Sequence, residues 1–483
     1  MKDEKIIDEI IDYFNILTKV PRKSGHEQEI SDTLKNWALE RGFTVKQNKA
    51  NDLIIDIPAT EGLEDLPLVC LQGHVDMVCV AKEGKKIDFL KDPIKPVIDK
   101  DKKKMTADGT TLGADDGIGI AIIMGVMDGK MAHGPVRAIF TTGEEVGMDG
   151  ALALDKEDLM GAKYLINIDS EESDTVVISS AADAMLSVTA KPKMVKSKNK
   201  HALMITLAGM HGGHSGTDIE KNFCNANIAL AEILKNLRTR AKYELVYMRG
   251  GTADNAITQK AEALIQVKKK DVDRVRHFIE KQKKFILENY KEKASKVELY
   301  TSRQTVSKKV LDKDVTKNVI KYIRKCVNGV YTMSEEIKGL VESSSNLGIM
   351  CIDEKGIEIR HQSRSSAPDK LTEIVNKQKK LAKQCKLSFE KERGSKAWPV
   401  NPDSKLVKKI CKVYKEQNSE KMKALAIHAG LECGVFADLN KDLDIASIGP
   451  DVLGAHSPDE TLMLDSIPKI WKLLEGVLGS IDK

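Results

Sequence analysis

The chain has 483 residues, with 77 Lys and Arg against 72 Asp and Glu, so its formal net charge is only +5. A dedicated nucleic-acid-binding protein is usually more basic, and the densest basic stretch, residues 191–201, has no interleaved aromatic residues. No apolar run reaches the length of a membrane span. These features predict a globular protein of two or three domains that binds neither nucleic acid nor membrane.

The N-terminal segment and the cysteines indicate the compartment. Residues 1–17 have the pattern of an amphipathic helix and lack the long apolar core of a signal peptide. The eight cysteines form no CxxC pair and no zinc-finger spacing, which is typical of reduced thiols. We therefore expect a cytoplasmic protein.

Helix and strand patterns alternate over the first part of the chain, and this alternation predicts an α/β sheet with helices on its faces. After the N-terminal helix, the expected elements are a helix at 27–42, strands at 52–59 and 66–77, a helix within 117–129, and strand runs at 136–145 and 164–172.

The middle of the chain differs in composition and in hydrophobic pattern. Residues 185–395 contain lysine-rich helices such as 271–293, mixed with exposed-looking strands. The prolines and glycine of 394–402 then mark a boundary. We expect a doubly wound α/β domain built from residues 1–184 and 396–483, with an inserted α+β domain at 185–395.

Histidine and acidic residues recur where apolar runs stop. His74 and Asp76 lie two apart at the end of one run, so a strand turns both side chains to the same face. Glu144 and Glu145 follow a second run, and Asp169 follows a third. Because ligands bind beyond the carboxyl ends of strands in open α/β sheets, we expect these groups to converge on one crevice.

Such a convergence points to metal. Clustered carboxylates repel one another, so they either bind cations or carry shifted pKa values, and metal is the more economical account. Imidazole with carboxylate suits zinc, with manganese or cobalt as alternatives, and a bridging carboxylate is typical of two-metal hydrolases. Asp115 and Asp116, between glycines at the head of a helix, are a further acidic site, for which helix capping is the alternative interpretation.

Five motifs, in this order, carry a family resemblance: GHVDMV, GADDGIGIA, TTGEEVGMDGA, NIDSEE and GAHSPDE. They resemble the co-catalytic zinc peptidases of the M20 type, and most closely the aminoacyl-histidine dipeptidases, also called cytosolic nonspecific dipeptidases. Shorter stretches extend the similarity across nearly the whole chain: PRKSGHE, GGHSG, DNAI, VESSSNLG, SRSS and IHAGLECGVF.

The resemblance implies a catalytic α/β domain with a lid and two divalent metal ions per subunit. His74 and Asp169 are then ligands of one ion, Glu145 and His456 are ligands of the other, and Asp115 bridges both. The implied activity is unspecific hydrolysis of dipeptides with free termini, including Xaa-His and β-alanyl-histidine.

The resemblance also implies catalytic roles. Asp76 orients an imidazole of the metal site, and Glu144 is the general base that takes a proton from water and passes it to the leaving amine. His214 stabilises the oxyanion of the tetrahedral intermediate, from the lid or from a partner subunit. The peptide bond between Asp115 and Asp116 is expected to be cis, as in the family.

Four further residues match substrate-binding positions. Asn255 lies in DNAI, where the family more often continues with proline, and Arg364 is suited to a bidentate grip on a terminal carboxylate. His428 and Glu432 are four residues apart, so on a helix they share a face, and the resemblance places them in the substrate pocket. A solvated pair at a helix start is the alternative interpretation.

Two other functions stay open. A related tripeptidase, aminoacylase or deacylase of N-acyl amino acids has the same metal site, although the long insert and HAGLECG favour the dipeptidases. An inactive member acting as a binding or scaffold protein is the alternative from another class, against which all five ligand positions, the base and Asp76 are present. Relatives are often dimeric through the lid, so we expect a homodimer that acts on short peptides.

Overall fold

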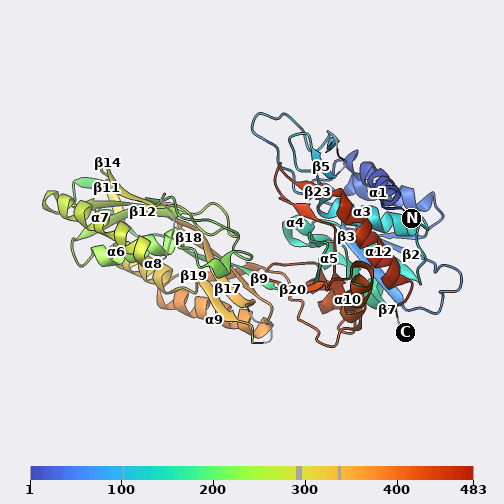
Figure 1. The fold of residues 1–483 in the computed structure, drawn as a ribbon. Helices are drawn as coiled ribbons and strands as arrows, with labels where there is room; N and C mark the ends of the chain where they lie inside the picture. The colour runs from blue at the N-terminus through green and yellow to red at the C-terminus, as the bar shows by residue number, and fades with distance from the viewer. Residues whose placement is uncertain (1, 100, 102, 290–295, 336–338, 482–483) are drawn as a thin grey trace. The chain divides into compact units, whose positions relative to one another are not determined.

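The computed structural model describes residues 2–99, 101, 103–289, 296–335 and 339–481. The chain forms two compact units, whose helices and strands are labelled in Figure 1. Unit 1 comprises Met1–Ser180, Trp398–Ala426 and Leu431–Lys483; unit 2 comprises Ala181–Ala397 and Ile427–Gly430. No helix in the described part is both long and apolar enough to span a bilayer.

Unit 1 is built on an eight-stranded mixed sheet of order β1-β2-β6-β3-β7-β21-β8-β20. The central strands β6, β3, β7 and β21 are parallel, with antiparallel strands on either side. The strands are β1 (Val45–Gln47), β2 (Leu53–Ile57), β3 (Leu68–His74), β6 (Val136–Thr141), β7 (Ala162–Asn167), β8 (Thr175–Ser180), β20 (Lys423–Ile427) and β21 (Asp444–Ser447). Parallel strands covered on both faces read as continuous apolar runs, as β3 does.

Helix α3 (Ala114–Met127) is buried along nearly its whole length. It packs against β3 on one side and α1 (Asp3–Thr18) on the other, so its sequence has no polar face after Asp116. Gly125 lets Trp471 of α12 (Ile467–Leu478) approach, since a Cβ there would lie 2.7 Å from the indole ring. The other helices of unit 1 are α2 (Gln28–Leu39), α4 (Glu144–Gly147), α5 (Asp149–Ala153), α10 (Lys405–Asn418) and α11 (Cys433–Leu439).

A small four-stranded sheet of order β22-β23-β5-β4 joins distant parts of unit 1. It pairs β5 (Lys104–Ala107) with β23 (Thr461–Met463), so residues just before α3 lie beside the C-terminal part of the chain. Its remaining strands are β4 (Pro96–Ile98) and β22 (Val452–Leu453).

Unit 2 is built on a nine-stranded sheet of order β14-β11-β13-β12-β17-β18-β9-β19, with β16 paired to β17. Its strands are β9 (Ala182–Ala190), β11 (His201–Ala208), β12 (Tyr243–Gly250), β13 (Ala261–Val267), β14 (Glu298–Gln304), β16 (Gly329–Met333), β17 (Val341–Ile352), β18 (Ile357–Ser365) and β19 (Ser388–Arg393). A separate pair joins β10 (Met194–Lys196) to β15 (Lys309–Leu311). Neighbouring strands of the main sheet run antiparallel, which fits the α+β insert expected for this region.

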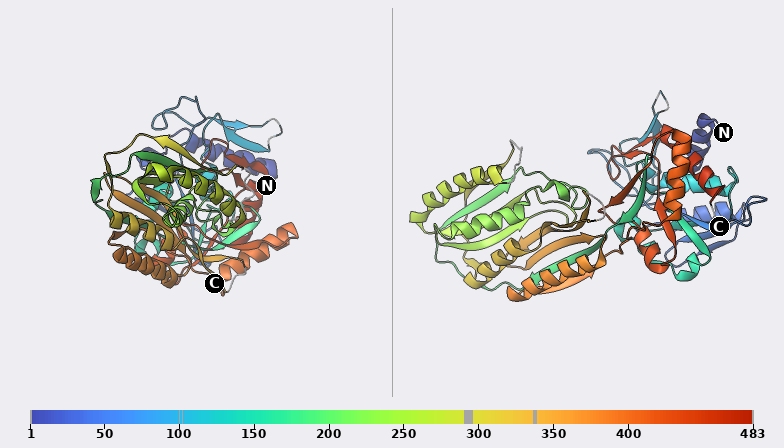
Figure 2. Two further views of the ribbon diagram at one scale, coloured as in Figure 1. Left: turned by 90° about the vertical axis from the view of Figure 1, so that its left-hand side faces the viewer. Right: turned by 60° about the horizontal axis from the view of Figure 1, so that its bottom comes forward.

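Four long helices pack on the sheet of unit 2. They are α6 (Ala226–Leu237), α7 (Val272–Asn289), α8 (Lys313–Lys325) and α9 (Pro368–Gln384). Helix α6 contacts α7 and α8, and α9 runs along β9, β18 and β19. In the right-hand view of Figure 2, α9 is the orange helix along the lower edge of unit 2. Helices α7, α8 and α9 carry several lysines each on their exposed faces, which explains why this part of the sequence is rich in lysine.

Unit 2 contains a buried histidine with a measurable consequence for stability. His361 on β18 is fully buried, with Nε2 3.1 Å from Tyr322 Oη and Nδ1 3.4 Å from Gln378 Nε2. Burial lowers the pKa of His361 to about 3. In the unfolded chain His361 takes up a proton near pH 6.5, whereas in the folded unit it stays neutral until a much lower pH. Its neutral, buried state therefore contributes to the free energy of unfolding in full above about pH 6.5, and this contribution is lost as pH falls toward 3.

We expect His361→Gln to weaken this acid dependence. Between pH 6.5 and pH 4.5 the lost stability of the wild type is about 2–3 kcal/mol, because each pKa unit corresponds to about 1.4 kcal/mol. Calorimetric unfolding at both pH values measures it, with His277→Gln, at an exposed position on α7, as the matched control. An acid dependence equal in His361→Gln and the wild type contradicts the prediction.

Candidate metal centre and active site

The candidate site lies where the parallel strands of unit 1 end. His74 is the last residue of β3, and β3 is hydrogen-bonded to β6 on one side and β7 on the other. Glu144 and Glu145 follow β6 after a short turn, and Asp169 follows β7. All three strands point the same way, so their carboxyl ends deliver these side chains to one edge of the sheet.

Asp115 enters the site from the start of α3. The chain reaches it through Gly113, whose φ of +71° is in the left-handed region, and the Asp115–Asp116 peptide is cis, as expected. Asp115 Oδ1 lies 3.1 Å from His74 Nε2, and Oδ2 lies 2.9 Å from His456 Nε2. The carboxylate of Asp115 therefore lies between the two imidazoles, with one oxygen facing each.

Two groups of three possible ligands share Asp115. One contains His74, Asp115 and Asp169; the other contains Asp115, Glu145 and His456; within each group the ligand atoms lie within 4.8 Å of one another. Asp169 Oδ1 is 3.4 Å from His74 Nε2, and Glu145 Oε1 is 2.8 Å from His456 Nε2. Imidazole nitrogens and carboxylate oxygens in this arrangement suit a pair of divalent cations.

Charges within this cluster perturb one another strongly. Hydrogen bonds with Asp115 and Glu145 raise the pKa of His456 to about 11. Burial raises the pKa of Asp169 to about 6, against the opposing effect of His74. Burial would also raise the pKa of Asp115, but hydrogen bonds with His456 and His74 hold it below its usual range. Carboxylates this close together repel one another unless positive charge lies between them.

Asp76 contacts both His74 and the turn that carries Glu144 and Glu145. It is fully buried, and its Oδ1 lies 3.5 Å from His74 Nδ1. The same carboxylate accepts the backbone N–H of Glu144 at 3.1 Å and that of Glu145 at 3.3 Å. Gly143, with φ of +63°, lets the chain leave strand geometry just before the two glutamates, as expected from the glycines around them. His74 Nδ1 also lies 3.2 Å from the backbone carbonyl oxygen of Asp76, so this residue contacts the imidazole through both its backbone and its carboxylate and holds the glutamate turn.

Glu144 lies at the edge of the ligand cluster. It is half-buried, and one of its oxygens lies within 4.8 Å of ligand atoms of His74 and Glu145. Burial raises the pKa of Glu144 well above its usual value; His74 opposes this effect, while Asp169 and Glu145 add to it. A carboxyl group with a raised pKa beside metal ligands has the properties of a proton-transfer group.

In unit 2, the loops that carry His214 and Asn255 are hydrogen-bonded to each other. The backbone N–H of Ser215 donates to the carbonyl oxygen of Asn255 at 2.7 Å. The backbone N–H of Thr217 donates to His214 Nδ1 at 3.3 Å. Because Nδ1 is an acceptor, a neutral His214 carries its proton on Nε2, and Nε2 is then a hydrogen-bond donor.

Arg364 and His428 lie in the same unit as His214. Both are largely buried: Arg364 Nη2 donates to Gln362 Oε1 at 3.0 Å, and His428 Nε2 lies 2.7 Å from Ser344 Oγ. Burial and the charges of Arg364 and His214 lower the pKa of His428 to about 3. With a pKa of about 3, His428 is neutral near pH 7, so the guanidinium of Arg364 is the group of this pair that suits an anionic ligand.

The structure does not place His428 and Glu432 on one helix. His428 follows β20 and belongs to unit 2, whereas Glu432 precedes α11 in unit 1, so no helix contains both. Glu432 is fully buried, where its carboxylate accepts from Gln72 Nε2 at 2.6 Å and Thr141 Oγ1 at 2.7 Å. Burial raises the pKa of Glu432 to about 8. The structure thus places Glu432 between β3 and β6, behind His74.

Sequence reasoning missed two buried charged residues beside the site. Arg22 Nη1 donates to the carbonyl oxygens of Val75 at 2.9 Å and Asp76 at 3.2 Å, and Glu460 accepts from backbone amides at the start of α3. Arg22 lies in PRKSGHE and Glu460 in GAHSPDE, so their membership of these motifs was the available signal. Their contacts depend on residues distant in the chain.

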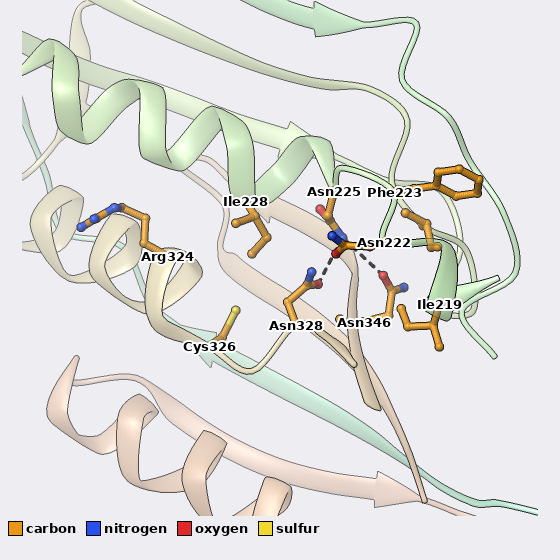
Figure 3. A pocket seen from close by; sticks show the side chains of 11 residues that line it. Ile219, Asn222, Phe223, Asn225, Ile228, Arg324, Cys326, Asn328 and Asn346 are labelled. Carbon is orange, nitrogen blue, oxygen red and sulfur yellow. Dashed lines mark hydrogen bonds between the residues drawn. The ribbon is translucent and has the colours of Figure 1, made fainter. Parts of the chain in front are cut away.

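Unit 2 also contains a cavity of about 250 Å³, drawn in Figure 3. Asn225 Nδ2 lies 3.4 Å from Asn328 Oδ1 and 3.3 Å from Asn346 Oδ1, so the amides on this wall bond to one another. The twelve predicted site residues all lie in the described part of the chain, and none of them lines this cavity. The cavity is nevertheless close to the loop of Asn255, since Asn346 on its wall donates to the carbonyl oxygens of Asp254 at 3.0 Å and Ala256 at 2.8 Å.

The sequence pattern of the peptidase family M20/M25/M40 matches residues 70–480. The chain belongs to this family. A cytosol non-specific dipeptidase of Escherichia coli is 33% identical to it over 473 residues, which cover 97% of each chain. An aminoacylhistidine dipeptidase from Vibrio alginolyticus has a crystal structure that matches with a TM-score of 0.85 at 29% identity, covering 98% of this chain and 97% of that one. A tripeptidase from Staphylococcus aureus shares the fold, with a TM-score of 0.56 at 15% identity over 98% of both chains.

Membership of the M20 family confirms the resemblance and the α/β fold with an inserted domain. It also confirms that the chain is an enzyme, a hydrolase of peptide bonds.

Proposed function

We propose that this M20 peptidase is a metal-dependent dipeptidase that cleaves dipeptides with free termini, including Xaa-His and β-alanyl-histidine. The observation that carries the proposal is the pair of ligand groups that share Asp115 at the ends of β3, β6 and β7. The name of the Escherichia coli relative and that of the Vibrio alginolyticus structure support a dipeptide substrate.

The donor set fits two divalent cations. Each group offers one imidazole nitrogen and carboxylate oxygens from two residues, a set that suits zinc, with manganese or cobalt as alternatives. His74 and Asp169 would hold one ion, Glu145 and His456 would hold the other, and Asp115 would be shared by both. When bound, the ions activate water and polarise the scissile carbonyl.

Glu144 acts as the general base. Its raised pKa and its place beside the ligand cluster suit a carboxylate that accepts a proton from water and then donates it to the leaving amine. Asp76 holds Glu144 in position through its backbone N–H and orients His74 with the same carboxylate.

Residues of the inserted domain supply oxyanion stabilisation and substrate binding. His214 donates from Nε2 to the negative charge that develops on the carbonyl oxygen, an interaction worth a few kcal/mol in comparable sites. Arg364 binds the terminal carboxylate of the peptide, with His428 and Asn255 in the same binding region. Closure of the inserted domain as a lid is then part of each catalytic cycle.

Removal of metal tests the proposal most directly. We expect chelator-stripped protein to lose hydrolysis of alanyl-histidine and β-alanyl-histidine, and to regain it with added zinc or manganese. A tripeptide and an N-acetyl amino acid, assayed in parallel, are expected to stay intact. Cleavage of only the tripeptide or the acetylated compound indicates one of the related specificities, and no cleavage with any metal indicates an inactive binding protein.

We further place the enzyme in the cytoplasm and expect a homodimer. The name of the Escherichia coli relative supports the compartment. Light scattering coupled to size-exclusion chromatography measures the assembly, and a mass equal to the 53.4 kDa of one chain contradicts the dimer.

A further inference from the structure

One carboxylate organises the backbone that presents Asp115. Glu460 is 2% exposed, and its two oxygens accept four consecutive backbone N–H groups. Oε2 accepts from Leu112 at 2.8 Å and from Gly113 at 3.0 Å. Oε1 accepts from Ala114 at 2.7 Å and from Asp115 at 3.3 Å. The loop at 112–115 is thus bound by a single side chain over its whole length.

The same residue belongs to the turn that carries His456. The backbone N–H of Glu460 donates to the carbonyl oxygen of Ser457 at 3.1 Å, and Ser457 Oγ donates to Gly454 O at 2.7 Å. His456 itself has φ of +61°, in the left-handed region, so this turn has an unusual backbone. Glu460 therefore connects two segments, 112–115 and 454–460, that are over 300 residues apart and each contribute a candidate ligand.

Buried positive charge balances this carboxylate. Arg22 is 2% exposed and hydrogen-bonds through its guanidinium to the carbonyl oxygens of Gly113, Val75 and Asp76. The guanidinium therefore contacts the same loop from the carbonyl side that Glu460 contacts from the amide side. Arg22 and Glu460 therefore both hold this loop by hydrogen bonds, one to a carbonyl oxygen and the other to the amides.

We propose that Glu460 is a positioning residue that fixes Asp115 between the two ligand groups and so sets the affinity of the site for metal. The inference rests on the proposed function, because it takes Asp115 as the bridging ligand. Glu460 does not act on substrate; it acts through the backbone of 112–115. Residues that orient metal ligands in this way typically change affinity by about 10–100-fold when they are replaced.

Glu460→Gln is the decisive variant. The amide keeps one acceptor oxygen, but its NH₂ group faces two of the four backbone N–H groups, so the clamp is lost at near-constant volume. We expect zinc or manganese to bind at least tenfold more weakly, measured by competition with a chromophoric chelator. We also expect faster hydrogen exchange of the amides of 112–115 in the absence of added metal, a readout independent of hydrolysis.

Two controls separate positioning from stability. Asp444 Oδ2 accepts the backbone N–H of Lys405 at 2.8 Å and of Leu406 at 3.0 Å at the start of α10, so Asp444→Asn removes a structural negative charge from a helix N-terminus. It is expected to lower the unfolding midpoint and leave metal affinity unchanged. Asp459→Asn makes the same change of charge beside Glu460, at an exposed residue, and is expected to alter neither.

The outcomes decide the inference. It is overturned if folded Glu460→Gln binds metal within twofold of the wild type, or if Asp444→Asn weakens binding equally. Should Glu460→Gln fail to fold, Glu460→Asp decides, since its shorter carboxylate keeps the charge and cannot reach all four amides; wild-type affinity and exchange then overturn the inference. A wild type that binds two ions but cleaves no peptide refutes the proposed function and leaves this inference standing.

Discussion

Glu144→Gln is expected to lower kcat for alanyl-histidine by about 10²–10⁴-fold while leaving metal content unchanged. Glutamine cannot accept a proton, so the variant loses the general-base step, which contributes about this factor in hydrolytic enzymes. Asp76 is still able to accept the backbone N–H of residue 144, so the position of the turn is retained. Steady-state kinetics together with elemental analysis for bound metal measure the effect.

The metal analysis matters because Glu144 also forms a possible ligand group with His74 and Glu145. If Glu144→Gln loses a metal ion together with activity, Glu144 is a ligand and the proposed division of roles between the two glutamates is wrong. Glu157→Gln, at an exposed position in the same unit, makes the identical chemical change and is expected to leave kcat as in the wild type.

Asp115→Ala, unlike Glu144→Gln, is expected to weaken metal binding strongly. Asp115 is the residue common to both ligand groups, so its loss removes one ligand from each ion at once. The expected fall in affinity exceeds the 10–100-fold or so that residues behind a metal site typically cause, and hydrolysis falls below detection. Isothermal titration of zinc into the stripped protein measures both stoichiometry and affinity.

Asp116→Asn provides the matched control for Asp115. Asp116 is buried, and its Oδ2 accepts the backbone N–H of His74 at 3.2 Å, a contact that the oxygen of an asparagine amide can also make. Burial, together with the charge of Asp169, raises the pKa of Asp116 well above its usual value. An amide of the same shape is therefore expected to preserve metal binding. Two ions bound tightly to Asp115→Ala contradict the bridging role.

Local pattern predicted much of the site because its residues stand at fixed places in regular elements. The spacing of His74 and Asp76 predicts a common face, and both side chains are buried together at the end of β3. Strand ends and the order of motifs placed Glu144, Glu145 and Asp169 at one sheet edge, where the structure also has them. Periodicity failed at His428 and Glu432, where the intervening turn carries the chain from one unit to the other.

The fold class, the family and the residue types available for chemistry can be predicted from the amino-acid sequence, since they follow from hydrophobic periodicity and from motifs along the chain. The contact of Asp115 with His456, the binding of four amides of 112–115 by Glu460, and the burial of Glu432 between β3 and β6 depend on the folded chain. Each of these contacts joins segments hundreds of residues apart. Sequence periodicity reports which face of an element is buried, but the partner across that face is chosen by packing of the whole chain.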